Sequence, residues 1–274
     1  MLLQDRSINM TKHLKPDTYA RHTIERYTGS TVDQFGSHIL LVNFQRYIEK
    51  FSEITGVSIN SGYWSVVHDR KNDISMINFG VGSPSAGIVT HCLSYLDQVK
   101  SVLMLGMCGG IDDKLEIGEL LIPTASVRDE GTSIHYLQQN VPAQPSFWIN
   151  RICEKVIEKE LSIIPKSGIM LTTDYRMWEF DEEFIDYILK HRILAIDMEI
   201  ATLFSVGYAL NLPIGSIMLI SDLPLQKGGI KSKESAEKVF QNYTEDHLMV
   251  GIKSIEAIKQ HSKKEPKGRL QSEW

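Results

Sequence analysis

Two acidic residues follow apolar stretches in the second half of the chain. Glu199 comes after residues 194–198 and starts an uncharged stretch of helical length, residues 200–210. Asp222 ends a second apolar run, residues 214–220 with Ser221. A strand, a helix and a strand in this order predict a βαβ unit, and ligands of open α/β sheets bind beyond the carboxyl ends of the strands. We therefore expect both carboxylates to face one cleft.

The two carboxylates have different expected environments. Apolar residues flank Asp222 on both sides, so burial should raise its pKa from about 3.9 and let it hold a proton near neutral pH. Glu199 begins a helix, where the helix dipole favours an ionised carboxylate. Taken singly, each residue is equally well explained as a cap of a helix or turn. Their pairing favours acid catalysis by Asp222 beside an anionic Glu199.

Composition limits the class of protein. The chain has 274 residues, 42% of them apolar, and a net charge of −5 without long charged blocks. These values predict one large α/β domain and argue against nucleic acid or a membrane surface as partner. Cys92, Cys108 and Cys153 are unpatterned, and the start of the chain lacks an apolar signal core. We expect a cytoplasmic protein with buried thiols.

Apolar runs and helical periodicity predict the remaining elements of the domain. Gly56 can end a helix, and Ser83 and Pro84 can begin one. The glycines between Gly106 and Gly110 are expected to end a strand and to let the backbone approach a ligand. We expect strands at 39–42, 74–79, 102–105, 120–127, 169–172, 194–199 and 214–220, and helices at 44–56, 84–97, 147–160, 181–191, 200–210 and 236–260.

The glycine-containing turns do not match a cofactor motif. Gly80 and Gly82 are followed by Ser85 where a dinucleotide fingerprint needs a third glycine, and no Walker A lysine motif is present. The nine histidines show no metal-ligand spacing. We therefore expect neither a cofactor nor a metal ion.

Several motifs together resemble one family. The stretches 106–110 (Gly-Met-Cys-Gly-Gly), 197–202 (Asp-Met-Glu-Ile-Ala-Thr) and 220–222 (Ile-Ser-Asp) resemble signatures of the purine nucleoside phosphorylase and nucleosidase family. Four further stretches are similar to its AMP nucleosidase branch: 26–29, 128–133, 173–179 and 221–224. The resemblance implies a single α/β domain with a central mixed, partly barrel-like sheet flanked by helices. It also implies cleavage of the bond between a purine and ribose.

The two ends of the chain lie outside the resemblance. Residues 1–25 lack periodicity and are expected to form a loose N-terminal arm or an oligomer contact, and residues 263–274 a charged tail. The resemblance implies a nucleoside phosphorylase-like catalytic domain at 26–262 and assigns roles within it. Glu199 and Met198 would bind ribose, and Asp222 would protonate the leaving purine. We expect the base to be held by Asp222 together with Tyr175, Trp178 and Ser221, and the substrate to lie near Gly82, Gly106, Met107, Gly109 and Glu130.

Two departures from the family pattern bear on the reaction. Phosphorylases hold inorganic phosphate with an arginine and a serine, and the matching positions here are Met104 and Met107. Thioethers replace neither a cation nor a hydroxyl, which favours attack by water. Arg176 falls near the family's base-stacking aromatic residue. Candidate ligands for a 5′-phosphate are Arg46, Arg128, Arg176 and Lys231, and candidates for activating the water are Glu130 and Glu49.

The sequence therefore predicts a hydrolase that converts AMP to adenine and ribose 5-phosphate. The alternatives are a purine nucleoside phosphorylase, a nucleosidase for unphosphorylated nucleosides, or a catalytically silent nucleotide-binding scaffold. By the same resemblance we expect a homo-oligomer, with a hexamer favoured. The longer AMP nucleosidases carry an N-terminal regulatory domain for which this chain has no room, so we do not expect control by a nucleotide triphosphate.

Overall fold

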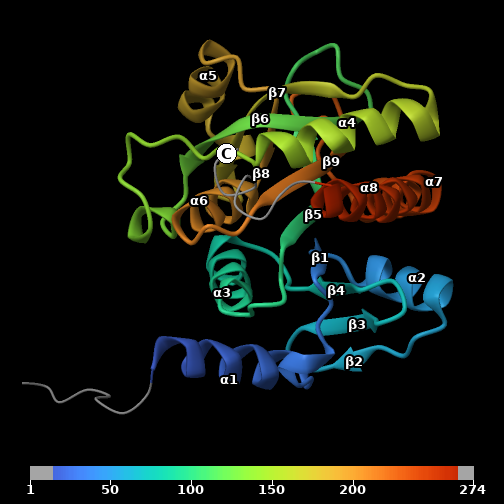
Figure 1. Cartoon of the computed structure of the whole chain (residues 1–274). Helices are drawn as coiled ribbons and strands as arrows, with labels where there is room; N and C mark the ends of the chain where they lie inside the picture. The colour runs from blue at the N-terminus through green and yellow to red at the C-terminus, as the bar shows by residue number, and fades with distance from the viewer. Residues whose placement is uncertain (1–14, 265–274) are drawn as a thin grey trace, which may run out of the picture.

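A nine-stranded mixed sheet forms the centre of the molecule in the computed structural model, which describes residues 15–264 (Figure 1). Its strand order is β2-β3-β4-β1-β5-β8-β7-β6-β9. The strands are β1 (His38–Val42), β2 (Asn60–Ser61), β3 (Ser65–Asp69), β4 (Ile74–Asn78), β5 (Ser101–Gly110), β6 (Leu120–Asp129), β7 (Lys166–Thr173), β8 (Ala195–Asp197) and β9 (Ile214–Asp222).

Strand β5 closes half of this sheet into a barrel. It pairs with β9 in parallel from Val102 onward, and its last two residues, Gly109 and Gly110, pair with β8 in the antiparallel direction. Strands β5, β8, β7, β6 and β9 therefore form a closed ring, while β1 to β4 continue from β5 as an open sheet. The predicted single α/β domain with a mixed, partly barrel-like sheet is confirmed.

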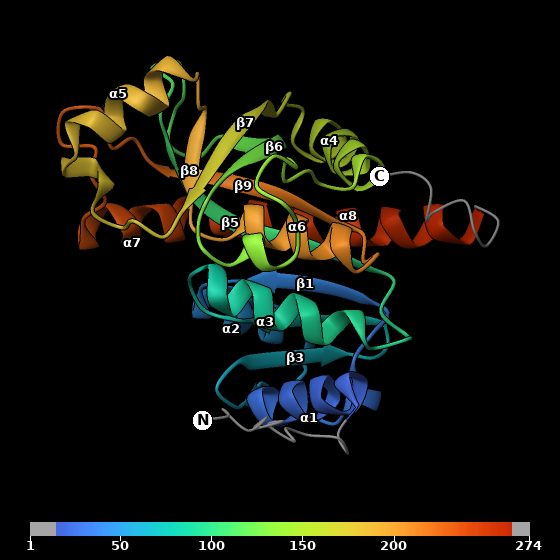
Figure 2. The same ribbon diagram turned by 90° about the vertical axis from the view of Figure 1, so that its left-hand side faces the viewer.

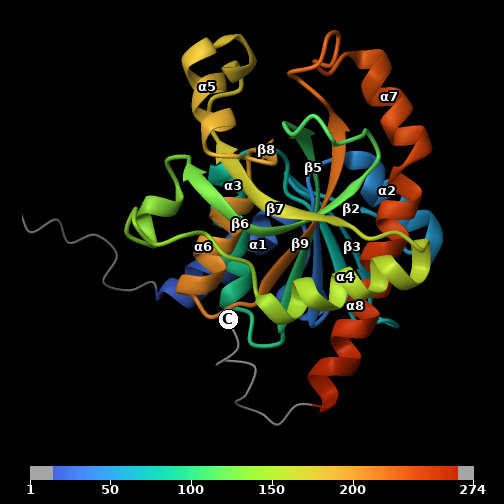
Figure 3. The same ribbon diagram turned by 90° about the horizontal axis from the view of Figure 1, so that it is seen from above.

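Helices cover both faces of the sheet and enclose two large apolar cores, and a third, smaller cluster includes Trp178 (Figures 2 and 3). One core packs Ile24, Val89 and Leu203 from α1, α3 and α6, and the other packs Ile48 and Ile255 from α2 and α8. None of the helices within residues 15–264 combines the length and the apolar character needed to cross a membrane. The helices are α1 (Pro16–Thr28), α2 (Gln45–Thr55), α3 (Ser83–Ser94), α4 (Phe147–Leu161), α5 (Glu182–Lys190), α6 (Ile200–Ala209), α7 (Lys233–Asn242) and α8 (Thr244–Lys264), with 3-10 turns at Val32–Gln34, Ser133–His135 and Trp178–Phe180.

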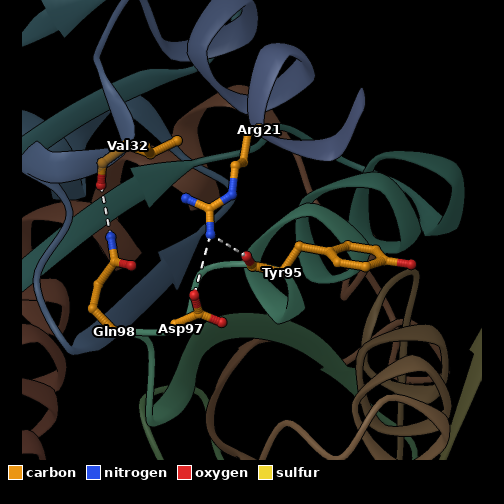
Figure 4. Close-up of polar contacts among 5 residues, drawn as sticks. All are labelled: Arg21, Val32, Tyr95, Asp97 and Gln98. Carbon is orange, nitrogen blue, oxygen red and sulfur yellow. Dashed lines mark hydrogen bonds and ion pairs between the residues drawn. The ribbon is translucent and has the colours of Figure 1, made fainter. Parts of the chain in front are cut away.

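Helix α1 corrects the predicted N-terminal arm. Arg21 Nη2 on this helix donates to the backbone oxygen of Tyr95 at 3.1 Å and contacts Asp97 Oδ2 at 3.4 Å (Figure 4). Gln98 Nε2 donates to the carbonyl of Val32 at 2.7 Å beside it. Residues 16–25 are thus part of a helix that is hydrogen-bonded to the end of α3. The prediction of a loose arm is wrong for these residues. Residues 1–14, and residues 265–274 of the predicted tail, lie outside the described residues.

Three other predictions about the elements are wrong. The glycine-rich run is not a break, because β5 continues to Gly110; a Cβ at Gly106 would lie 2.7 Å from the Met218 side chain, so glycine serves packing there. The predicted helix 236–260 is two helices separated at Tyr243. Strands β8 and β9 do not form a parallel βαβ pair, because β8 runs antiparallel to β5 and β9 runs parallel to it.

Candidate functional site

A cavity of about 290 Å³ opens where β8 and β9 end, at Asp197 and Asp222. Glu199 and Asp222 both line it, although they come from separate strand ends. Asn43, the residue after β1, reaches the same cavity. Of the residues predicted for the site, the cavity wall contains Met107, Gly109, Tyr175, Arg176, Trp178, Met198, Glu199, Ser221, Asp222 and Lys231.

Asp197 sets the position of Glu199. Its Oδ2 accepts hydrogen bonds from the backbone N–H groups of Glu199 at 3.0 Å and Ile200 at 2.7 Å, so it caps the start of α6. Its Oδ1 accepts from Thr172 Oγ1 at 2.6 Å. Glu199 Oε1 in turn accepts from the backbone N–H of Gly82 at 2.7 Å, where a positive φ of 102° suits glycine. These contacts hold the carboxylate of Glu199 in the wall of the cavity.

The surroundings of Glu199 disfavour its charge. Burial, and then the charge of Asp197, raise the pKa of Glu199 to about 8, against hydrogen bonds from Gly82 and Asn43 that favour the ionised form. Burial raises the pKa of Asp197 to about 6. Burial and the charge of Asp197 thus act against the helix dipole, which favours the ionised form of Glu199. A buried neighbouring carboxylate outweighs the helix dipole here.

Asp222 also lines the cavity, beside a hydroxyl and an amine. Ser221 Oγ donates to Asp222 Oδ1 at 2.5 Å, and Lys231 Nζ donates to Ser221 Oγ at 3.1 Å. Burial raises the pKa of Asp222, as predicted, while Lys231 and Arg176 partly oppose that rise. A Cβ at Gly109 would lie 3.0 Å from the side chain of Pro224, so the glycine leaves room for that ring beside Asp222.

Aromatic side chains and an ion pair form a third wall. Tyr175 and Trp178 line the cavity as predicted, with Trp178 only 5% exposed. Glu179 also lines it, its side chain is 6% exposed, and its Oε1 is 2.9 Å from Arg176 Nη1. Arg176 itself is 55% exposed. Glu179 was not predicted as a site residue, although it lies within the stretch 173–179 that carried the resemblance.

Two other residues of the cavity wall were absent from the predicted site. Asn43 and Phe44 follow the predicted strand 39–42, so the rule of carboxyl strand ends could have identified them. Phe44 also approaches Lys231, whose Nζ is 5.4 Å from the centre of the Phe44 ring. The Oδ1 atom of Asn43 is buried and has no hydrogen-bond partner among the described residues.

Two of the four predicted cationic ligands lie outside the cavity wall. Arg128 donates to the backbone oxygens of Leu137, Gln138 and Val141, at 2.8, 2.5 and 2.7 Å respectively, so it holds its own loop together. Arg46 pairs with Glu237 at 2.5 Å on the surface. Their assignment as phosphate ligands is not supported by this arrangement, whereas Arg176 and Lys231 do line the cavity.

The residues suggested for activating water are also elsewhere. Glu130 is buried, and its Oε2 accepts from the backbone N–H groups of Thr132 at 2.7 Å and Ser133 at 2.9 Å, which makes it a turn cap outside the cavity wall. Glu49 is exposed on α2. Gly82 and Gly106 act through the backbone and packing rather than as wall residues. Among residues 15–264 no group of three or more acidic, histidine or cysteine side chains is arranged to hold a metal ion.

Comparison with known proteins matches this geometry. The model of the phosphorylase superfamily matches residues 41–256. An AMP nucleosidase of Escherichia coli K12 is 25% identical over 282 aligned residues, which cover 86% of this chain and 58% of that protein. A DeoD-type purine nucleoside phosphorylase of Buchnera aphidicola is 27% identical, with 69% of this chain and 80% of that protein covered. This chain thus spans little more than half the length of the Escherichia coli relative.

Solved structures show the same fold. The crystal structure of an AMP nucleosidase from Bacteroides thetaiotaomicron has a TM-score of 0.80 and 33% sequence identity, and the match covers 91% of this chain and 100% of that one. A uridine phosphorylase from Vibrio fischeri, at 21% identity, has a TM-score of 0.74 over 86% of this chain and 98% of its own. With the family model matching most of its length, this chain belongs to the phosphorylase superfamily.

Proposed function

We propose that this protein hydrolyses the N-glycosidic bond of AMP to give adenine and ribose 5-phosphate. The observation that carries the proposal is that Glu199 and Asp222 line one cavity. The similarity to AMP nucleosidases from two bacteria supports AMP as the substrate. Both carboxylates are nearly buried, so their charges act there with little screening by water.

The two carboxylates divide the chemistry of bond cleavage. As the bond breaks, positive charge develops on ribose and negative charge on the purine. Asp222, protonated, gives its proton to N7 of the leaving adenine. Glu199, ionised, accepts hydrogen bonds from the ribose hydroxyls and stabilises the cationic sugar. The two residues must therefore hold one proton between them, and it must be on Asp222.

The walls around the sugar support hydrolysis over phosphorolysis. Met104 is fully buried and Met107 lines the cavity, in the positions where a phosphorylase carries an arginine and a serine. Phe44 adds an aromatic ring to the same region, 5.4 Å from Lys231 Nζ. Apolar side chains of this kind offer inorganic phosphate no hydrogen bonds. The two methionines therefore supply neither of the donors with which a phosphorylase holds phosphate, which favours water as the nucleophile.

Lys231 is the best candidate for the 5′-phosphate. An ammonium group has three donors, and one of these is engaged by Ser221 at 3.1 Å. Arg176 is already paired with Glu179, and its side chain is more exposed. One charge-assisted hydrogen bond of roughly 1.5–3 kcal/mol would favour AMP over adenosine by about tenfold to a hundredfold.

Base release from a small set of substrates tests the proposal. The pure protein is incubated with AMP, adenosine and inosine, each with and without inorganic phosphate, and free base is measured by chromatography. We expect adenine from AMP without phosphate, with Asp222→Asn as the matched inactive control. Strictly phosphate-dependent release would identify a phosphorylase, and a preference for adenosine would identify a nucleosidase for unphosphorylated substrates. Binding of AMP without release would identify a scaffold.

A further inference from the structure

We propose that Glu179 selects a 6-aminopurine base by accepting a hydrogen bond from its exocyclic amino group. Glu179 lies on the 3-10 turn Trp178–Phe180, directly after Trp178 in the aromatic wall of the cavity. The inference rests on the proposed function and adds to it the residue that distinguishes adenine from hypoxanthine.

The carboxylate of Glu179 has one oxygen available for a ligand. Its Oε1 contacts Arg176 Nη1 at 2.9 Å, while no residue in the described part of the chain makes a hydrogen bond to its Oε2. The side chain is 6% exposed and lines the cavity. A carboxylate oxygen in a cavity wall that has no donor from the protein is available to accept a hydrogen bond from a ligand.

The position of Glu179 relative to Asp222 identifies the atom that it would meet. Asp222 protonates N7 in the proposed reaction, and on a purine the substituent at C6 lies on the same edge as N7. Glu179 is close enough for its charge to add to the rise of the pKa of Asp222, and both line the same cavity. Because both acidic residues line one cavity, a base that presents N7 to Asp222 can place its C6 substituent at Glu179.

The chemistry at C6 then separates the two classes of purine. Adenine carries an amino group, a donor, whereas hypoxanthine and guanine carry a carbonyl oxygen, an acceptor. An ionised carboxylate can only accept, so it pairs with the amino group and repels the carbonyl. A 6-oxo base would also leave Glu179 buried without a donor at Oε2. Sites of this type reject the wrong analogue strongly.

A purely structural role for Glu179 makes a different prediction. If the carboxylate only anchors Arg176, its loss should lower cleavage of every nucleotide by the same factor. A role in base selection changes the ratio between substrates. Glu179→Gln distinguishes the two, because its amide can either accept from an amino group or donate to a carbonyl at little change in size.

The experiment measures kcat/KM for AMP, IMP and purine riboside 5′-monophosphate, which has hydrogen at C6. We expect the wild-type protein to favour AMP over IMP by about a hundredfold or more, and Glu179→Gln to reduce that ratio to about tenfold or less. Glu183→Gln, an exposed residue on α5, is the matched control and should leave the ratio unchanged. Removal of the amino group from the substrate should cost the wild-type protein at least tenfold and Glu179→Gln much less.

Three results would overturn the inference while the proposed function stands. One is AMP cleavage with an AMP to IMP ratio that Glu179→Gln leaves unchanged. Another, which needs no variant and so holds even if Glu179→Gln misfolds, is a wild-type preference for AMP over purine riboside 5′-monophosphate of less than threefold. The third is equal binding of adenine and hypoxanthine to the wild-type protein by calorimetry. Failure to release base from any nucleotide contradicts the proposed function instead.

Discussion

Two nearly buried carboxylates line the cavity in different electrostatic surroundings. Glu199 is 2% exposed and Asp222 is 8% exposed. Glu199 has the carboxylate of Asp197 as its charged neighbour, whereas Asp222 has the cations of Lys231 and Arg176 within electrostatic range, together with the anion of Glu179. Burial raises both pKa values, and the neighbours add to the rise at Glu199 but mostly oppose it at Asp222.

This difference bears on the protonation of each carboxyl group. Burial and the charge of Asp197 favour the protonated form of Glu199, whose pKa is raised to about 8. Ribose hydroxyls that donate to Glu199 stabilise its charged form, because hydrogen bonds to an anion lower its pKa. The comparison therefore indicates that bound substrate moves the proton preference toward Asp222, where acid catalysis needs it. Substitution of either carboxylate, Glu199 or Asp222, tests this interpretation.

Removal of the carboxyl group of Asp222 should have the largest effect on activity. Asp222→Asn keeps the size of the side chain but cannot supply the proton, so kcat should fall by about a hundredfold to ten-thousandfold. Because the amide can still contact the base, KM for AMP should change by less than about threefold. Steady-state adenine release measures both values. An unchanged kcat would remove Asp222 from the acid role.

Removal of the ionisable group of Glu199 should stabilise the folded protein at alkaline pH. The pKa of Glu199 rises from 4.5 to about 8 on folding, so its contribution to stability is complete below pH 4.5 and is lost as the pH rises toward 8. The side chain of Glu199→Gln cannot ionise. Between pH 5 and pH 9, the free energy of unfolding of this variant should therefore rise by about 2–4 kcal/mol relative to that of the wild-type protein.

Thermal and urea unfolding at the two pH values measure this gain. Glu183→Gln, which replaces an exposed carboxylate on α5, controls for the loss of a surface charge. A Glu199→Gln variant whose stability has the same pH dependence as the wild-type protein would show that folding does not raise the pKa of Glu199. The same variant should also lose activity, because its amide stabilises the cationic sugar less well.

Local signals in the sequence were sufficient for much of the framework. Continuous apolar runs identified the buried strands, and Gly56 ends α2 in the left-handed conformation, with φ 67°. The rule that sites gather at carboxyl strand ends placed Glu199 and Asp222 at one cavity. These features depend on residues that are near one another in the chain.

The remaining features depend on contacts between distant segments. Closure of the barrel needs β5 to pair with both β8 and β9, and no local pattern specifies the direction of a three-residue strand such as β8. The hydrogen bond from Gly82 to Glu199 joins residues 117 positions apart. Arg128 was indistinguishable from a ligand until its loop carbonyls were seen around it. The electrostatic contrast between the two acids was therefore not predictable.

Replacement of Lys231 should reduce the electrostatic difference between Asp222 and Glu199. Its ammonium favours the ionised form of Asp222, so Lys231→Met should raise the pKa of Asp222. Activity needs protonated Asp222, and the alkaline limb of the pH–rate profile should move up by about half a unit to one unit. Adenosine is the substrate of choice for this profile, because it has no 5′-phosphate for Lys231 to bind. Lys227→Met, an exposed residue of the same loop, is the control, and a limb that moves down would contradict the assignment.

Replacement of Arg46 should have the smallest effect on activity. It tests whether Lys231 and Arg176 are the cations that make the surroundings of Asp222 differ from those of Glu199. Its guanidinium pairs with Glu237 at the surface, where the two side chains are 47% and 45% exposed, and it does not line the cavity. Exposed ion pairs contribute little, so Arg46→Met should change kcat/KM for AMP by less than about twofold. The pH–rate profile should stay in place, unlike that of Lys231→Met. A loss of about tenfold or more specific to AMP over adenosine would instead place the 5′-phosphate at the start of α2 and extend the basic end of the cavity beyond Lys231 and Arg176.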